Sequence, residues 1–214
     1  MKSVVKSIVR ALALLAVLPA LGSFHLRAAL MGRDRALEGS TQWLGMIPGV
    51  LGEYLRRAFL AQTLAECAPT ATIGFGVLFS RAGARVGEQV YIGPRCHIGL
   101  AHIGRDVLLA AGVHVPSGAR THGTGDTGTS IRDQETTYSV VRIGEGTWVG
   151  SAAVVMADVG PHAVIGAGAV VTKALPGWVV AAGVPARIVR AREGAPQVQV
   201  EADEVATAAR AADA

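Results

Sequence analysis

Aliphatic residues recur about every six positions through the middle of the chain, residues 73–179. In most of these units Gly follows the aliphatic residue, and a small or β-branched residue lies four positions after it. The clearest units begin at Ile73, Val86, Ile92, Ile103, Ile143, Val149 and Ile165. Such a hexapeptide period is the sequence signature of a parallel β-helix, in which three short strands make one coil of about eighteen residues. We therefore expect the aliphatic residues to point into the prism, and the glycines to adopt turn conformations that strain other residues.

The period is lost over residues 121–142, which are polar and rich in turn-forming residues. A loop of this length that leaves a regular scaffold is usually functional or disordered. A tolerated insertion is the alternative. We therefore expect an all-β solenoid interrupted by one long loop, and we look for chemistry at the point where the loop leaves it.

Three regions follow from the pattern. Residues 1–68 are predicted to be helical and membrane-associated, residues 69–190 to form the β-helix, and residues 191–214 to form an acidic, Ala-rich tail. Hydrophobic residues are 50% of the chain but aromatic residues only 5%, which suits a coil too narrow for large rings. The formal charge of +4 is uneven, because eight Lys or Arg residues lie in the first sixty positions. No basic run with interleaved aromatic residues occurs, so nucleic-acid binding is not expected.

The chain starts with basic residues and a short apolar segment. Lys2, Lys6 and Arg10 precede residues 11–21, which Pro19 interrupts. At roughly 11–14 residues this segment is too short to span a bilayer as one helix. A cleaved signal peptide, a helix that caps the β-helix, and a helix on the membrane surface all fit the pattern, and we prefer the last.

A second apolar segment, residues 43–64, contains Arg56 and Arg57. Apolar groups beside two arginines fit an interfacial helix on anionic lipid. Each Lys or Arg held near such a surface contributes about 1 kcal/mol, so the first sixty residues predict peripheral membrane attachment.

Two cysteines and six histidines are the first candidates for side-chain chemistry. Cys96 falls at the small position of a repeat and is expected to be a buried thiol, and neither it nor Cys67 is part of a Cys-x-x-Cys metal motif. His122 opens the long loop directly after a rung, so we expect its side chain outside the prism, held by a rigid wall and covered by the loop. A neutral imidazole can accept a proton from a hydroxyl or an amine at physiological pH. His97 and His114 are equally well explained as surface or corner histidines.

A series of motifs runs from the loop to the end of the repeats. In IGRDVLLAAGVHVPSGARTHG, a Gly-Val-His-Val segment leads into Thr121-His122, and GTWVGSAAVV, GAGAVVTKALP and AAGVPARIVR follow. These motifs resemble the hexapeptide acetyltransferases of the maltose and galactoside O-acetyltransferase type. This chain has two residues more than those enzymes between the Gly-Val-His-Val segment and the Thr-His pair. Four further segments are most similar to acyltransferases of exopolysaccharide and lipopolysaccharide synthesis: GLAHIG, SGxxxHG, IRDQ and PGVLGEYLRRAF. The histidine that matches His122 is the family's general base.

The resemblance implies a left-handed β-helix, direct transfer from acetyl-CoA, and a homotrimer with the donor in a groove between neighbouring subunits. It also implies a set of donor-binding positions. Trp148 and Ser151 match positions near the pantetheine arm; Ala167, Thr172 and Lys173 match positions along the cofactor; Arg187 and Arg190 match positions near its phosphates. Lys and Arg at the end of a β-helix also suit a phosphorylated ligand on physical grounds.

One departure from the family concerns the oxyanion. The maltose and galactoside enzymes have an Asn on an earlier coil that helps to bind the acceptor and the oxyanion, whereas this chain contains no Asn. The oxyanion donor is therefore a backbone N–H or another side chain. Within the long loop, Asp126, Arg132, Asp133 and Glu135 could bind acceptor hydroxyls or orient His122, and the sequence does not choose among them.

The expected function is acetyl-CoA-dependent O-acylation, without a metal, of a sugar hydroxyl in a surface polysaccharide or its lipid-linked precursor. Because acetyl-CoA is cytosolic, we expect the protein on the inner face of the cell membrane. N-acylation and longer acyl groups stay open. So does a γ-type carbonic anhydrase, whose zinc is held by three histidines: His97 and His102 have a suitable spacing, but no His occurs between His25 and His97. A non-catalytic β-helical scaffold is the third class, and binding of coenzyme A would discriminate against it.

Overall fold

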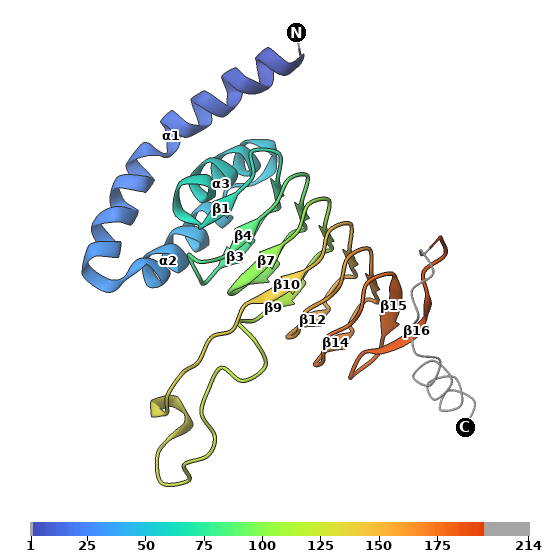
Figure 1. Ribbon diagram of the computed structural model, residues 1–214. Helices are drawn as coiled ribbons and strands as arrows, with labels where there is room; N and C mark the ends of the chain where they lie inside the picture. Colours follow the sequence, from blue (N-terminus) through green and yellow to red (C-terminus); the bar gives the residue numbers. More distant parts are fainter. Residues whose placement is uncertain (1, 195–214) are drawn as a thin grey trace, which may run out of the picture.

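A computed structural model describes residues 2–194, and their side chains from Lys6 onward. Three helices come first: α1 (Lys2–Met31), α2 (Arg33–Gly45) and α3 (Gly49–Thr63). They lie at one end of a long solenoid of short strands, and the chain reaches the other end near residue 191 (Figure 1). Most of the predicted acidic tail lies outside the described residues.

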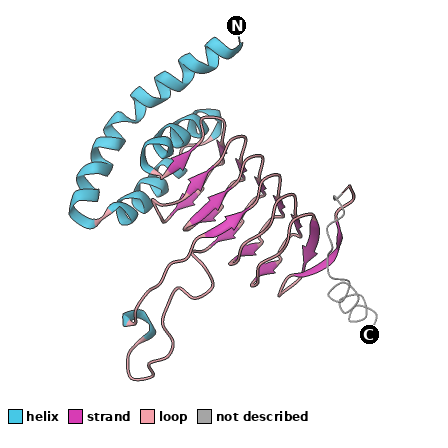
Figure 2. Cartoon of the chain, in the orientation of Figure 1, coloured by secondary structure: helices cyan, strands magenta, loops and turns pink. Residues whose placement is uncertain are grey.

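The strands form three sheets, one on each face of a prism (Figure 2). Sheet A contains β1 (Glu66–Cys67), β4 (Arg85–Val86), β7 (Ala101–Ile103) and β10 (Val141–Ile143). Sheet B contains β2 (Thr72–Ile73), β5 (Tyr91–Ile92), β8 (Leu108–Leu109), β11 (Trp148–Val149), β13 (Val164–Ile165), β15 (Val179–Ala182) and β16 (Arg187–Ala191). Sheet C contains β3 (Leu78–Phe79), β6 (His97–Ile98), β9 (His114–Val115), β12 (Val154–Val155) and β14 (Val170–Val171). Neighbouring strands are parallel except β15 and β16, which pair antiparallel. The predicted parallel β-helix is confirmed, with about six turns.

The core is a stack of the aliphatic residues that define the period. In almost every two-residue strand the first side chain faces outward and the second is buried, as at Ile73, Ile92, Leu109, Val149 and Ile165 on sheet B. Full burial of one such side chain contributes about 1.5–3 kcal/mol. The hexapeptide period is therefore the energetic basis of the fold.

The glycines that follow the aliphatic residues have a different role from the one predicted. These glycines do not adopt a positive φ. A positive φ occurs three positions after the aliphatic residue, in Gly76 and Gly112 but also in Gln89 and Arg95. A Cβ on Gly93 would lie 2.8 Å from the backbone of the next coil. Gly is required there because adjacent coils approach too closely for a side chain, so the prediction of a strained turn conformation was wrong.

Helices α2 and α3 cover the first coil and close the core at that end. Arg56 on α3 is 3% exposed, and its guanidinium donates hydrogen bonds to the carbonyls of Ile73, Leu44 and Ile47. Burial lowers its pKa from the usual arginine value. Arg57 donates to the carbonyl of Ala71 and packs over the ring of Tyr54. The prediction that both arginines belong to a lipid-facing surface was wrong for Arg56, because its side chain is buried between the helical cap and the β-helix. Arg57 is half-buried and also joins the cap to the β-helix.

Helix α1 is continuous through Pro19 and packs across both α2 and α3. Its inner face buries Val17, Leu21 and Phe24 in the cap. The helix has 30 residues, so at 1.5 Å per residue it is about 45 Å long. From Lys6 to Met31 it is long and apolar enough to cross a membrane by length and composition alone. The prediction that the apolar segment is too short to span a bilayer was wrong, because the helix does not end at Pro19.

Candidate active site

A long arm, residues 116–140, leaves the β-helix between β9 and β10 (Figure 1). It stands on the corner between sheets C and A, at the position where the sequence loses its period. The two sides of the arm are joined by backbone hydrogen bonds from Ser139 to Ser117, from Thr137 to Thr121 and from Gly123 to Glu135. The excursion is therefore a paired hairpin-like segment and not an open loop.

His122 lies on this arm, where its backbone bridges that of Thr136 across the pair. The side chain is exposed, and no hydrogen bond or ion pair to its imidazole occurs within residues 2–194. The expectation that it stands outside the prism is correct, but the expectation that a rigid wall holds it was wrong. His122 is carried away from the wall by the arm, so the other groups of any site around it must come from elsewhere.

The tip of the arm is organised by its own polar groups. The Gln134 amide donates to the carbonyls of Asp126 and Thr129, and one Asp126 carboxylate oxygen accepts from the backbone N–H of Gly128. Hydrogen bonds from Thr129 and Gly128 lower the pKa of Asp126 below its ordinary value. Asp126 is thereby a turn-forming residue.

The three other loop residues considered as acceptor ligands are exposed. Arg132 and Asp133 form an exposed ion pair, with 3.9 Å between Nε of Arg132 and Oδ1 of Asp133. Glu135 lies on the returning side of the arm, nearer to His122. Of the loop carboxylates, Glu135 lies closest to His122 along the paired backbone, because the carbonyl of Glu135 accepts from Gly123, the residue after His122.

The base of the arm is tied to the helical cap. The Arg81 guanidinium lies 3.5 Å from the centroid of the Tyr138 ring and forms an ion pair of 3.0 Å with Asp34 of α2. The other Asp34 oxygen accepts from the backbone N–H of Ala82. Since Tyr138 is two residues from the bridge partner of His122, these contacts position the catalytic candidate relative to α2. Sequence reasoning missed them, because Asp34, Arg81 and Tyr138 are far apart in the chain and none belongs to a motif.

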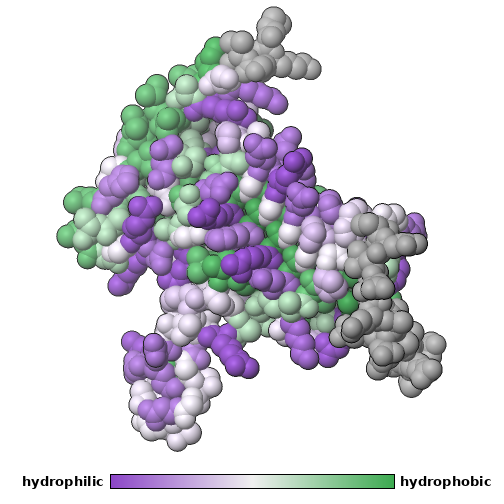
Figure 3. Space-filling model, viewed as in Figure 1, coloured by the Kyte–Doolittle hydropathy of each residue, from purple (hydrophilic) through white to green (hydrophobic). Residues whose placement is uncertain are grey.

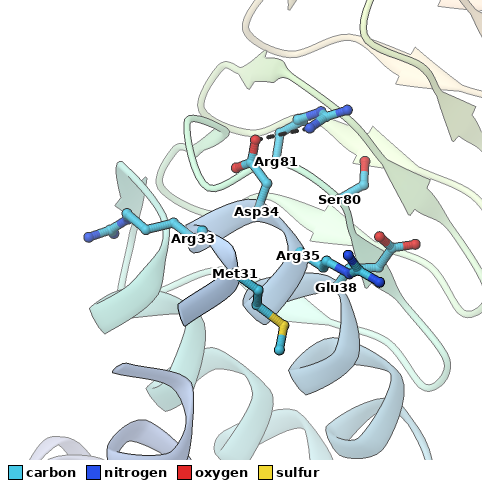
Figure 4. A pocket seen from close by; sticks show the side chains of 8 residues that line it. Met31, Arg33, Asp34, Arg35, Glu38, Ser80 and Arg81 are labelled. Atoms are coloured by element: carbon cyan, nitrogen blue, oxygen red, sulfur yellow. Dashed lines mark hydrogen bonds and ion pairs between the residues drawn. The ribbon is translucent and has the colours of Figure 1, made fainter. Parts of the chain in front are cut away.

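An open hollow of about 720 Å³ lies beside the ion pair of Asp34 and Arg81, between the start of α2 and the corner after β3. Asp34 and Arg81 meet at one side of it, while Arg35 and Glu38 lie close together at the other and Met31 lies below (Figure 4). Most of its lining is polar or charged.

Three of the seven donor-binding residues implied by the resemblance lie on sheet B. Trp148 is 52% exposed and points outward from β11. Through Val164 and Val180 it belongs to the same outward column as Arg190 on β16. Three strand spacings of about 4.8 Å put these two residues about 14 Å apart. Arg187, also exposed, lies on the same final strand.

Ser151 and Ala167 occupy equivalent corners between sheets B and C in successive coils, where the N–H of Gly168 donates to the Ser151 carbonyl. Both are exposed and small. Thr172 and Lys173, in contrast, lie on the corner between sheets C and A. That corner is the one from which the arm leaves, but it lies further along the β-helix.

The implied site is therefore divided between one edge and one face of the prism. His122, Thr172 and Lys173 belong to the C–A edge, whereas Trp148 and Arg190 belong to sheet B. The C–A edge lies opposite sheet B in the prism, so one chain does not bring all these residues together.

The remaining histidines do not form a metal site in the part of the chain that is described. His97 and His114 stack with ring centroids 5.0 Å apart on the outer face of sheet C, and burial together with His97 lowers the pKa of His114. His102 lies on sheet A, where burial and its neighbours Arg85 and Arg142 lower its pKa. No group of three His, Cys, Asp or Glu residues able to hold a metal occurs among the described residues. The placement of His97 and His102 on different sheets does not favour the zinc alternative.

No protein-family model matches the chain. Over 92 residues it is 40% identical to galactoside O-acetyltransferase from Escherichia coli (strain K12), a match that covers 41% of this chain and 42% of that relative. The match thus spans less than half of the relative's length. In structure the chain is similar to a maltose O-acetyltransferase from Clostridium difficile 630, with a TM-score of 0.66 at 22% identity over 77% of this chain and 89% of that one.

It is also similar to a galactoside acetyltransferase in complex with coenzyme A, with a TM-score of 0.57 at 25% identity over 74% of this chain and 80% of that one. The sequence match and the shared architecture confirm the resemblance inferred from the motifs. This chain is a homologue of galactoside O-acetyltransferase over part of its length, and it has the β-helical fold of the maltose and galactoside acetyltransferases.

Proposed function

We propose that this chain is an acyltransferase that moves an acetyl group from acetyl-CoA to a sugar hydroxyl. The observation that carries the proposal is the sequence match to a galactoside O-acetyltransferase, in a β-helix that presents a histidine on a protruding arm. A galactoside acetyltransferase of the same fold has been solved with coenzyme A, which supports the same donor for this chain.

The exposed residues of sheet B and its corner fit a coenzyme A thioester. Arg187 and Arg190 are exposed guanidiniums on one strand and suit phosphates, which planar guanidinium groups bind with two parallel hydrogen bonds. The small side chains of Ser151 and Ala167 leave room for a thin pantetheine arm, and the ring of Trp148 offers an apolar surface beside it. When bound there, acetyl-CoA supplies the acetyl group as a reactive thioester.

His122 acts as the general base in this proposal. The neutral imidazole accepts the proton of the acceptor hydroxyl while the oxygen forms its bond to the acyl carbon. The C–S bond then breaks, and the imidazolium returns the proton to the departing sulfur. His122 ends in its starting state, and no covalent intermediate forms on the protein.

A homotrimer is the assembly that we propose for the active form. Tyr91, Leu108, Trp148, Val164 and Val180 form one outward column on sheet B, hereafter the sheet B strip. Its large side chains are exposed in the single chain, and apolar patches of this kind mark contact surfaces. A neighbour packed near the strip could bring its own His122 to the donor, and closed threefold symmetry would repeat that site three times.

Light scattering and a charge placed in the strip test the assembly. Leu108→Lys should give a smaller particle with reduced activity, while Val184→Lys, at an exposed position outside the strip, should change neither. A wild-type chain that is monomeric and still active at nanomolar concentration would contradict the trimer.

The test of the reaction is transfer to a panel of galactosides, maltosides and oligosaccharides with acetyl-CoA as donor. Free thiol should appear together with the mass of an acetyl ester on the sugar. His122→Ala should lower the rate by roughly 10²–10⁴-fold, whereas His114→Ala, another exposed histidine, should leave it near wild type. Activity of His122→Ala within a few-fold of wild type would exclude His122 as the base. If no acetylated product forms and coenzyme A does not bind, the acyltransferase proposal itself fails.

For the acceptor and the location, we propose a surface polysaccharide or its lipid-linked precursor, modified on the cytoplasmic side of the membrane. The exposed apolar side chains of α1, shown in green at the upper left of Figure 3, support contact with a membrane. Removing all residues before Thr70 would also remove Phe59 and Leu60 from the core, so truncation is a poor test. Leu12→Gln with Leu15→Gln should instead release the full chain from membranes. Recovery of the wild-type protein in the periplasm would refute the location.

Mass spectrometry of the surface polysaccharide, with and without this protein, tests the acceptor directly. Loss of an acetyl group from the polysaccharide is the expected result. An unchanged polysaccharide would refute this acceptor without affecting the acyl-transfer proposal, which the purified enzyme tests separately.

A further inference from the structure

A groove of about 540 Å³ lies between α1 and the pair α2–α3, away from the arm and from sheet B. This volume is in the range of small-molecule sites. Its walls are mainly apolar, and a few polar groups lie at one end. The lining residues on α1 are Ala16, Val17, Pro19, Ala20, Ser23 and Arg27. Those on α2, α3 and the turn between them are Gly39, Ser40, Trp43, Leu44, Ile47 and Leu55.

The groove adjoins a stripe of exposed apolar residues on α1. Ile8, Leu12, Leu15, Leu26 and Leu30 are exposed and recur at intervals that keep them on one face of the helix. Pro19 falls on the same face and also lines the groove, so stripe and groove share an edge. A surface that places the stripe in contact with lipid would therefore open the groove to lipid as well.

The polar end of the groove contains a guanidinium without a counter-charge. Arg27 donates to the Ser40 hydroxyl at 2.8 Å and to the carbonyl of Ala36 at 3.3 Å, both neutral groups. No carboxylate pairs with Arg27 among residues 2–194. A guanidinium has five N–H donors, so donors remain for an anion. Ser23 lies one turn before Arg27 on α1 and adds a hydroxyl to the same end.

Trp43 marks the groove on the α2 side. It is 74% exposed, and Met46 beside it is also exposed. Aromatic side chains with a polar N–H are typical of the membrane interface, where one end of the ring is apolar and the other is hydrated. An apolar channel, a free cation at one end and an interfacial ring are the complement of one acyl chain with a phosphate at its head.

We propose that this groove binds an anionic phospholipid of the membrane, with one acyl chain between α1 and α2–α3 and the phosphate on Arg27. The continuity with the exposed stripe and the unpaired charge favour this occupant over a second copy of the chain. The proposal goes beyond acyl transfer and does not depend on it, since its readouts involve neither acetyl-CoA nor a sugar.

The experiment uses the full chain with Trp148→Phe and Trp178→Phe, so that Trp43 is the remaining tryptophan. Vesicles of phosphatidylcholine are compared with vesicles that also contain phosphatidylglycerol with brominated acyl chains, which quench nearby indoles. The expected result is binding to the anionic vesicles with strong quenching of Trp43. Binding without quenching would mean that the protein adsorbs to the vesicle surface without a lipid chain in the groove. That result would overturn the proposal.

Matched variants separate the head group from the chain. Arg27→Gln should weaken binding to the anionic vesicles about five- to tenfold, Arg27→Lys should retain it, and Arg35→Gln, a basic residue of α2 outside the groove, should change it less than twofold. Equal effects of Arg27→Gln and Arg35→Gln would overturn the phosphate contact.

Ala20→Phe fills the groove and should abolish quenching, while Ala29→Phe, at an exposed position of the same helix, should not. Thermal unfolding of both variants checks that each is folded. If Ala20→Phe does not fold, the Arg27 variants alone decide whether the groove binds the phospholipid. A concentration-dependent oligomer that Ala20→Phe disrupts, with no quenching by lipid in the parent, would identify a second copy as the occupant and overturn the proposal.

Discussion

Replacing the buried Arg56 by Met should strongly destabilise the fold, although the residue is far from the candidate site. The side chain of Met has a comparable length and no donors. Its introduction would remove the donors that Arg56 supplies to the carbonyls of Ile73, Leu44 and Ile47. These three carbonyls belong to the first coil, the end of α2 and the turn before α3, so one side chain joins all three parts of the cap.

The magnitude follows from the contacts that are lost. The carbonyl of Leu44 also accepts from the backbone N–H of Ile47, so two carbonyls are left without a partner. At about 1–3 kcal/mol for each, the gross loss is roughly 2–6 kcal/mol. Removing the buried charge returns part of that sum, because burying an ion costs several kcal/mol. We expect a net loss of about 3 kcal/mol. Arg57→Met is the matched control on the same helix: it loses a single carbonyl contact and the ring of Tyr54, worth about 1 kcal/mol together.

Urea unfolding at a fixed protein concentration measures the difference, since assembly also contributes to the stability of an oligomer. With a slope of about 3 kcal/mol per M urea, Arg56→Met should shift the midpoint down by about 1 M and Arg57→Met by about 0.3 M. Equal midpoints for the two variants would refute the account of Arg56 as the residue that holds the cap to the β-helix.

Three further changes test the fold and the arm. Gly93→Ala should cost about 1–3 kcal/mol in urea unfolding because its Cβ would meet the next coil, whereas Gly125→Ala, with open space around it, should be neutral. Burial raises the pKa of the Cys96 thiol to about 11; the unfolded chain then loses this proton first, so stability should fall as the pH rises from about 9 toward 11, and a shallower fall in Cys96→Ala would confirm the cause. Tyr138→Ala should release the arm from Arg81 and speed amide exchange in the arm about fivefold, while Tyr138→Phe should not; identical exchange in both would show that the ring does not anchor the arm.

The sequence predicts those features that depend on local spacing. Each unit buries its aliphatic residue in the same way, so a period of six is enough to predict the coils, and loss of the period places the arm. Cys96 is buried as expected because it occupies a fixed position of the repeat. The role of Gly93 could not be inferred from its own conformation, because the neighbour that excludes a side chain belongs to the next coil, many residues away.

Contacts between distant segments are where sequence reasoning fails. Arg56 on an apolar helix is as consistent with lipid as with buried carbonyls, and only the position of the first coil decides between them. Pro19 interrupts the apolar pattern, yet α1 continues through it, because Val17 before it and Phe24 after it are both buried against the cap. The Asp34–Arg81–Tyr138 contacts join three segments that no motif connects.

The implied site is divided between the C–A edge and sheet B, and this division bears on the mechanism. A motif identifies residues by their order, and order along a solenoid places successive units on different faces of the prism. His122 and Trp148 are close in sequence, but the chain turns from the C–A edge through sheet A to sheet B between them. If both act in one reaction, the folded monomer is not yet the enzyme, because the groups meet only across a contact between chains. Acyl transfer should then depend on protein concentration in the range where the assembly dissociates, and Leu108→Lys should reduce activity and particle size together. A variant that lost the assembly but kept full transfer would show that His122 and Trp148 do not belong to one site.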